Sequence, residues 1–529
     1  MSYRNRLDTL LLASAVATTR FAFRSRDLYD LDSVNFALAM KRFDPRVHQP
    51  HPPGYFLYIL MGRFIDFMVH DANLALVLLS IAASTGMVIM IYRMAWDWFC
   101  PGTARFAGIL FLFSPLGWFH GTVALTYSLE AFFSALLGDL CWRIECGKTA
   151  FIAPASLILG ISAGVRPSSL LLLGPLFLFS LRKATASQKV LGGVVLVLTL
   201  ATWFLPMIWA SGGLGAYFGA LVSLWQLVPA RDTVFNSSPA TSIARACTIV
   251  FIYFLCFGLA SVVPLAALRR TTLVDPKKKI FTIVWISPAL CFFTFVYLRF
   301  VNSGYLLLLL APACIWLGSW ASEWYEHTGW RKSWKVTVIG LCGATNVLIF
   351  LVAPLYCSYK SVRQFETELA SIRSSFPQFG PPDATLIVGF DSHFLGYRHG
   401  GYYLPNYLTI EYPEVKLREG TRIFAMHERD SSLLTGLPAA AYTRFVLFPL
   451  QGGDVAYQQY MQKVEKLLPQ ENLRILRVGD HEFVSCPISD LPLLFPDAAS
   501  APRQSVYAAL HSGMPPVNNR EHQAGQEDR

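Results

Sequence analysis

Two carboxylates, Asp30 and Asp32, stand close together after the first apolar run of the sequence. They precede an apolar stretch that ends near Met40 and can lie at a membrane surface as a helix. A carboxylate placed there can act as general base toward a hydroxyl, or hold a divalent cation against a phosphate. The structural alternative is that one of the two caps the helix, since Asp is a preferred N-cap residue.

A proline-rich turn follows in the same loop, with the sequence His48-Gln49-Pro50-His51-Pro52-Pro53-Gly54-Tyr55. The turn is rigid, and it returns the chain to the membrane with two imidazoles nearby. The two histidines have a spacing that metal ligands can have, but the prolines disfavour a helical metal site. The turn itself is therefore the stronger indication of function.

Three ionisable residues lie inside or at the ends of apolar runs, where burying a charge requires a reason. They are Glu130, Arg166 and Arg299. We expect both arginines at outer helix ends, where the preference of basic residues for the inner face does not explain them. Each can bind a lipid phosphate through two parallel hydrogen bonds, or can simply reach toward ordinary phospholipid. Glu130 is an alternative partner for one of them.

The elements that must position these residues are membrane spans. Of the 529 residues, 54% are hydrophobic and 15% are charged, whereas soluble proteins carry about 25% charged residues. This balance excludes a soluble enzyme, a disordered chain and a small disulfide scaffold. We predict an all-α polytopic membrane protein with about 11 transmembrane helices. The predicted spans lie near 7–23, 73–95, 105–119, 124–142, 151–165, 168–182, 190–210, 246–268, 280–298, 303–321 and 334–356.

The net charge of +10 reflects basic residues in short loops rather than an affinity for nucleic acid. A cytoplasmic N-terminus places these basic loops inside, as integral proteins of the cytoplasmic (inner) membrane prefer. With an odd number of spans, the chain after residue 356 then lies outside the cell. The ten cysteines are scattered singly and do not have the spacing of a zinc or redox site.

Three segments are predicted. Residues 1–356 form a catalytic membrane domain with outer loops at 24–72 and 211–245. Residues 357–496 form a soluble extracytoplasmic α/β domain, and residues 497–529 form a disordered tail. The predicted strands of the second segment are Thr385–Phe390, Arg422–Met426, Arg444–Leu450 and Leu473–Val478, with a helical stretch at 456–468.

Together these motifs resemble the C-type (GT-C) superfamily of integral-membrane glycosyltransferases. The closer resemblance is to its bacterial branch of protein-mannosyltransferase-like and lipid-A-sugar-transferase-like enzymes, which use polyprenyl-phosphate sugars. It covers roughly residues 1–320, through the acidic motif at 30–33, the turn at 51–55, the glycine-and-basic segment at 160–167, and Arg299 followed by the segment 302–305. The sequence departs from the family pattern at two points. Its acidic motif is Asp-Leu-Asp rather than an adjacent acidic pair, and it has His51 before the Pro-Pro turn, where several relatives have Lys or Glu.

The resemblance implies an inverting transfer of a sugar from a polyprenyl-phosphate lipid to a hydroxyl of a glycan, lipid or protein acceptor. It implies Asp32 as base, Asp30 as its partner or as a metal ligand, and Arg166 and Arg299 as phosphate ligands. The residues expected to contact or orient the acceptor are Glu130, His51 and Tyr305. The resemblance implies no certain cofactor and leaves a metal requirement open, with Asp30 and Asp32 as the residues that can hold a divalent cation. Membrane lipids are the remaining partners.

Two other functions stay open. A polysaccharide polymerase or ligase would use a diphosphate-linked donor, and we expect more arginines in its large outer loops. A lipid or solute transporter would show paired repeats and broken helices, which the sequence does not display.

Overall fold

The computed structural model describes residues 3–227, 239–258, 260, 275–295, 300–353, 357–389, 394–411, 442–448, 466–478 and 481–494. The chain divides into two compact units, Met1–Thr367 and Glu368–Arg529. Several predicted features lie outside the described residues: Arg299, the strand at 422–426, most of the helical stretch at 456–468, and the tail at 497–529.

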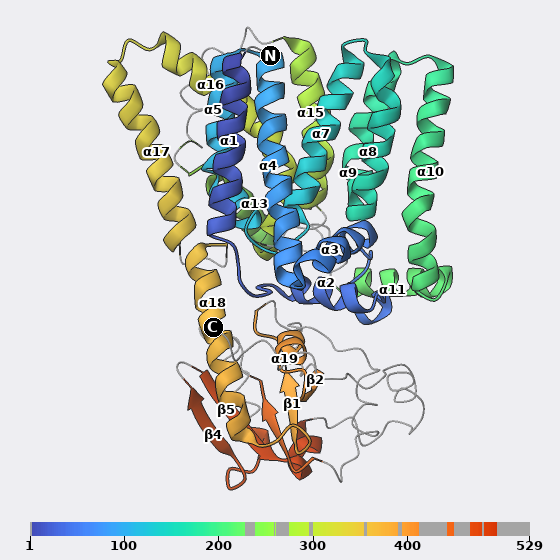
Figure 1. Ribbon diagram of the computed structural model, residues 1–529, viewed down its shortest axis with the longest axis vertical. Coiled ribbons are helices and arrows are strands. Elements are labelled where there is room, and N and C mark those ends of the chain that lie inside the picture. The colour runs from blue at the N-terminus through green and yellow to red at the C-terminus, as the bar shows by residue number, and fades with distance from the viewer. Residues whose placement is uncertain are drawn as a thin grey trace. The chain divides into compact units, whose positions relative to one another are not determined.

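The first unit is a bundle of apolar helices (Figure 1). Five helical segments of its described part are long and apolar enough to cross a membrane, namely Ala72–Trp98, Ala186–Ala210, Pro276–Phe295, Ser303–His327 and Lys332–Val352. The count of about 11 spans stays a prediction. The bundle helices are α1 (Tyr3–Ala22), α4 (Ala72–Trp98), α5 (Pro101–Leu112), α6 (Pro115–His120), α7 (Tyr127–Glu145), α8 (Ile152–Val165), α9 (Ser168–Ser180), α10 (Ala186–Ala210), α13 (Pro239–Phe257), α15 (Pro276–Phe295), η7 (Phe300–Leu309), α16 (Leu310–His327) and α17 (Lys332–Val352).

Two segments differ from the sequence prediction. The single span predicted at 105–119 is divided between α5 and α6, because Ser114 caps a new helix that begins at Pro115. The predicted outer loop at 211–245 contains a further helix, α11 (Leu214–Leu227). Its exposed face is apolar and includes Leu214, Phe218, Val222 and Trp225, as expected of a helix that lies at a membrane surface.

The first loop contains two short helices, α2 (Leu31–Lys41) and α3 (Phe56–Val69), which lie with α11 at one end of the bundle (Figure 1). The proline-rich turn joins them and includes cis peptide bonds before Pro50 and Pro53. Tyr55 caps α3 in the left-handed region, with φ of 47°. This conformation is uncommon for a tyrosine, and it directs the side chain away from the path of the helix.

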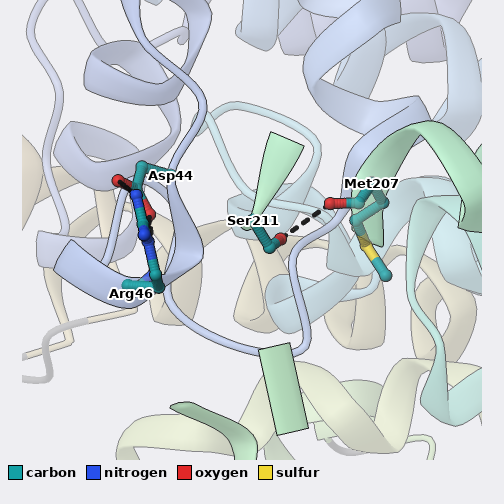
Figure 2. A network of polar contacts seen from close by, with 4 residues as sticks. All are labelled: Asp44, Arg46, Met207 and Ser211. Carbon is teal, nitrogen blue, oxygen red and sulfur yellow. Dashed lines mark hydrogen bonds and ion pairs between the residues drawn. The ribbon is translucent and has the colours of Figure 1, made fainter. Parts of the chain in front are cut away.

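The corner between α10 and α11 holds this turn in place. Asp44, at the start of the turn, accepts two hydrogen bonds of 2.8 Å from the Arg46 guanidinium. The neighbouring Ser211 hydroxyl closes the end of α10 by donating to the Met207 carbonyl at 2.7 Å (Figure 2). The Tyr217 hydroxyl of α11 donates to the Pro53 carbonyl at 3.1 Å. The last of these contacts ties α11 to the backbone two residues before Tyr55.

The second unit contains a five-stranded sheet of order β2-β1-β3-β5-β4. β1 pairs in parallel with β2 and β3, whereas β5 runs antiparallel to β3 and β4. The strands are β1 (Thr385–Gly389), β2 (Leu408–Glu411), β3 (Arg444–Leu447), β4 (Arg474–Val478) and β5 (His481–Pro487), with helix α19 (Tyr397–Tyr403) between β1 and β2. Helix α18 (Tyr359–Ser375) contributes residues to both units. The extracytoplasmic location of the sheet stays a prediction.

Candidate active site

The two carboxylates of the first loop have different surroundings. Asp30 is the N-cap of α2, and its Oδ1 accepts a hydrogen bond of 2.8 Å from the Asp32 backbone N–H. This is the capping role that the sequence left open for one of the two. The side chain of Asp32 is 30% exposed, and its Oδ1 lies 3.2 Å from His51 Nδ1. Asp32 is therefore the carboxylate that is available for chemistry.

His51 connects Asp32 to the start of α3. Its other ring nitrogen, Nε2, is 2.8 Å from the Tyr55 hydroxyl. Which of these two atoms donates depends on the tautomer of the imidazole, since a neutral ring has one donor and one acceptor nitrogen. Asp32, His51 and Tyr55 thus form a continuous polar chain, which the unusual backbone of Tyr55 makes possible.

Arg166 and Glu130 form a buried ion pair deeper in the bundle. Arg166 follows α8 and is 3% exposed, while Glu130 lies in the first turn of α7 and is 1% exposed. The guanidinium Nη1 is 3.4 Å from Glu130 Oε2, and it donates to the Thr126 hydroxyl at 3.1 Å. Glu130 Oε1 accepts from the Ser169 hydroxyl at 2.9 Å. The pair is completed by hydrogen bonds, as a stable buried pair must be.

Three tyrosine rings surround the guanidinium of Arg166. Its carbon atom is 4.0 Å from the ring centre of Tyr305, 4.7 Å from that of Tyr127 and 5.7 Å from that of Tyr55. Contacts of this kind are cation–π interactions and stabilise a buried positive charge. Tyr55 therefore belongs both to the polar chain of Asp32 and to the ring cluster around Arg166.

The structure thus brings together five of the residues singled out in the sequence: Asp32, His51, Glu130, Arg166 and Tyr305. Asp30 lies beside them as a cap, and Arg299 lies outside the described residues.

Sequence reasoning missed Tyr55 and Tyr127 as part of this cluster. Tyr55 stands at the end of the proline-rich turn, and Tyr127 stands in the segment that also contains Glu130. A tyrosine at a span end is most simply an aromatic anchor at the membrane surface. What sets Tyr55 and Tyr127 apart in the sequence is that Tyr55 ends the proline-rich turn and Tyr127 lies three residues before Glu130.

A divalent cation is not supported by the residues present. Within the described part of the chain, no group of three or more His, Cys, Asp or Glu side chains could hold a metal ion. One oxygen of Asp30 already accepts the backbone N–H of Asp32, which leaves Asp32 and His51 as the two candidate ligands that lie together.

The chain resembles known proteins in sequence over part of its length. Residues 44–189 match the family described as the protein O-mannosyl-transferase TMEM260 N-terminal domain. This segment includes the proline-rich turn, Glu130 and Arg166. No curated protein matches the chain in sequence.

The fold is similar to that of ArnT from Cupriavidus metallidurans bound to undecaprenyl phosphate. The TM-score is 0.56, with 11% sequence identity over 90% of this chain and 97% of that chain. The apo state of ArnT gives a TM-score of 0.53 at 12% identity, covering the same shares of both chains. The apo oligosaccharyltransferase from Archaeoglobus fulgidus gives 0.49 at 11% identity, covering 84% of this chain and 70% of that chain.

The resemblance predicted from the sequence is confirmed at the level of the fold. The apolar helices and these structural neighbours identify an integral membrane protein. The protein has the fold of the GT-C membrane glycosyltransferases, and its residues 44–189 match a protein O-mannosyl-transferase domain.

Proposed function

We propose that the protein is an inverting glycosyltransferase that moves a sugar from a polyprenyl-phosphate donor to a hydroxyl acceptor on the outer face of the cytoplasmic membrane. The observation that carries the proposal is the joining of the Asp32–His51–Tyr55 chain to the Arg166–Glu130 pair within a GT-C fold. The donor class is supported by the likeness to ArnT, whose structure holds undecaprenyl phosphate.

Asp32 is the base in this proposal. His51 occupies its Oδ1, and the partly exposed carboxylate has no other partner among the residues that the structure describes. It accepts the proton of the acceptor hydroxyl as the acceptor oxygen attacks the anomeric carbon. The new C–O bond forms on one face of the sugar while the bond to the phosphate oxygen breaks on the other, which inverts the anomeric configuration.

The departing lipid phosphate requires positive charge and hydrogen-bond donors. Arg166 provides a guanidinium that its neighbours hold in one orientation, and Arg299 is proposed as a second phosphate ligand. Glu130 orients Arg166, His51 orients Asp32, and Tyr305 covers one side of the guanidinium. We assign Glu130, His51 and Tyr305 an orienting role, and direct contact with the acceptor is the alternative role for each.

The test uses purified protein in nanodiscs with radiolabelled polyprenyl-phosphate and polyprenyl-diphosphate sugars. We compare the wild type with Asp32→Asn, and with Asp97→Asn as a matched control. Asp97 is a half-exposed carboxylate near the opposite end of α4, in contact with Arg143. We expect Asp32→Asn to bind donor but to lose turnover by about 100- to 10,000-fold, and Asp97→Asn to retain turnover.

A third variant, Asp30→Ser, separates capping from chemistry, because Ser caps a helix about as well as Asp. Retained turnover would assign Asp30 to capping alone, and lost turnover with normal folding would restore its role as partner or ligand. Turnover of diphosphate-linked donors alone would favour a polymerase or ligase. A wild type that binds none of the donors would contradict the proposal and favour a transporter.

A further inference from the structure

His120 is a buried histidine with no partner for its ring nitrogens. It ends α6 and is 1% exposed. Neither Nδ1 nor Nε2 has a hydrogen-bond partner among the described residues. Burying two polar atoms without partners costs free energy, so an unpaired imidazole in a folded protein requires an explanation.

The imidazole lies beside the ring cluster around Arg166. Its ring centre is 5.0 Å from that of Tyr127, the residue whose ring also contacts the guanidinium. On the other side the backbone of η7 approaches at Gly304. A Cβ atom added to Gly304 would lie 2.4 Å from Tyr127 Cδ2 and 2.8 Å from His120 Cε1. The absence of a side chain at this position lets η7 bring Tyr305 next to Arg166.

The protonation state of His120 follows from this position. A charged imidazolium buried beside the Arg166 cluster would add a second cation with no carboxylate partner of its own among the described residues, so the neutral form is the one that fits this position. A neutral imidazole presents one N–H donor and one nitrogen acceptor. It therefore suits a ligand that offers an acceptor and a donor close together.

The charge of Arg166 indicates why such a group is needed. Glu130 offsets part of the charge of the guanidinium within the buried pair, so Arg166 alone does not meet the full requirement of an incoming phosphate. Additional hydrogen-bond donors must then stabilise the phosphate oxygens. A sugar linked to a phosphodiester offers both complements of a neutral imidazole, namely a phosphate oxygen as acceptor and a sugar hydroxyl as donor.

We infer that His120 is a binding residue for the glycosyl phosphodiester of the donor lipid, donating its N–H to a phosphate oxygen and accepting a hydrogen bond from a sugar hydroxyl. The inference rests on the proposed function and adds a residue to its donor site. Donor binding would supply the hydrogen-bond partners that the described residues do not provide for the two ring nitrogens.

The experiment compares His120→Phe, His120→Gln and the wild type in nanodiscs. Phe keeps an aromatic ring but removes both nitrogens, whereas Gln keeps one N–H group and one acceptor oxygen. Two quantities are measured: the melting temperature without ligand, and the affinity for undecaprenyl phosphate and for polyprenyl-phosphate sugars. Turnover is then measured at saturating donor.

We expect His120→Phe to melt at a higher temperature than the wild type and to bind polyprenyl-phosphate sugars about 10- to 100-fold more weakly. His120→Gln should retain most of the affinity. Undecaprenyl phosphate should lose less affinity than the sugar-bearing lipid, because it lacks the hydroxyl. Turnover at saturating donor should change less than affinity, since Asp32 is intact.

Unchanged donor affinity in a folded His120→Phe protein would overturn the inference and make His120 a packing residue. If the larger ring of His120→Phe prevents folding, His120→Leu takes its place as the variant without nitrogens, and unchanged donor affinity there would overturn the inference equally. These outcomes concern the variants alone. Failure of the proposed function appears instead in the wild type, as absence of donor binding and transfer.

Discussion

Helix α7 contains three buried carboxylates, Glu130, Asp139 and Glu145, and the first two are paired in different ways. Asp139 is paired within its own helix, since Arg143 one turn later donates to both of its oxygens at 2.8 and 3.2 Å. Glu130 is paired by Arg166 and Ser169, which lie at the end of α8 and the start of α9. Glu130 therefore depends on the packing of three helices.

This difference separates a structural pair from a prepared site. Around Asp139 the partners are local, and Arg93 of the neighbouring α4 adds a second cation at 3.8 Å. Around Glu130 the partners are distant in sequence, three tyrosines enclose the cation, and His120 is left without a partner among the described residues. Strain and unpaired polar groups gather where binding energy is needed.

The largest difference in stability is expected between variants that remove the cation beside Glu130 and the cation beside Asp139. We expect Arg166→Met to lower the free energy of unfolding by about 3–5 kcal/mol, because it leaves Glu130 as an unpaired buried charge. Arg143→Met should cost about 1 kcal/mol or less, since Asp139 keeps Arg93. Detergent-unfolding curves measure both.

Adding Glu130→Gln to Arg166→Met should recover most of the lost stability, because the unpaired charge is gone, but it should not recover turnover. Equal losses of unfolding free energy in Arg166→Met and Arg143→Met would contradict the distinction between the two pairs. Recovery of turnover in the double variant would remove Arg166 from the donor site.

A smaller effect is expected where η7 approaches the ring cluster. Gly304→Ala introduces a methyl group within 2.4 Å of Tyr127, and overpacking of this kind costs about 1–3 kcal/mol. Gly174→Ala is the matched control, because nothing lies within 4 Å of a Cβ atom at Gly174 in α9. It should stabilise by up to about 1 kcal/mol. The melting temperatures of the two variants test this expectation. A melting temperature of Gly304→Ala equal to that of Gly174→Ala would show that close packing does not require a glycine at position 304.

The smallest effect concerns the support of the proline-rich turn. Tyr217→Phe removes the hydrogen bond to the Pro53 carbonyl and should cost about 0.5–1.5 kcal/mol. Because Pro53 lies two residues before Tyr55, we expect a clear fall in kcat together with only a small shift of the melting temperature. Phe218→Leu, on the exposed face of the same helix, is the control. Equal effects of the two changes on kcat would show that the turn needs no support from α11.

Features set by local spacing could be predicted from the sequence. The apolar runs indicate helices near the predicted spans, and a four-residue spacing such as that of Asp139 and Arg143 is typical of an ion pair within a helix, which the structure contains. The break at Ser114 was missed because the run of apolar residues continues through it, while the capping hydroxyl and the following proline determine the backbone. Strands β2 and β5 were also missed.

The site was harder to predict, because its contacts join residues that are far apart in the chain. The spacing of the carboxylates did not reveal which of them caps α2, since both Asp30 and Asp32 are suited to that position. The partner of Glu130 was open because no periodicity relates it to Arg166. His120 had no motif around it, and only its burial without a partner, seen in the folded chain, sets it apart.

The pairing of Glu130 with Arg166 also bears on how the chain enters the membrane during synthesis. Glu130 and Arg166 lie on different helices, so α7 entering the lipid alone would carry a carboxylate without its cation. An unpaired carboxylate in hydrocarbon is costly, which favours entry of α7 and α8 together as a helical hairpin with the pair already formed. Tyr305 arrives much later. The charged core of the site is therefore assembled early, and η7 closes over it toward the end of insertion.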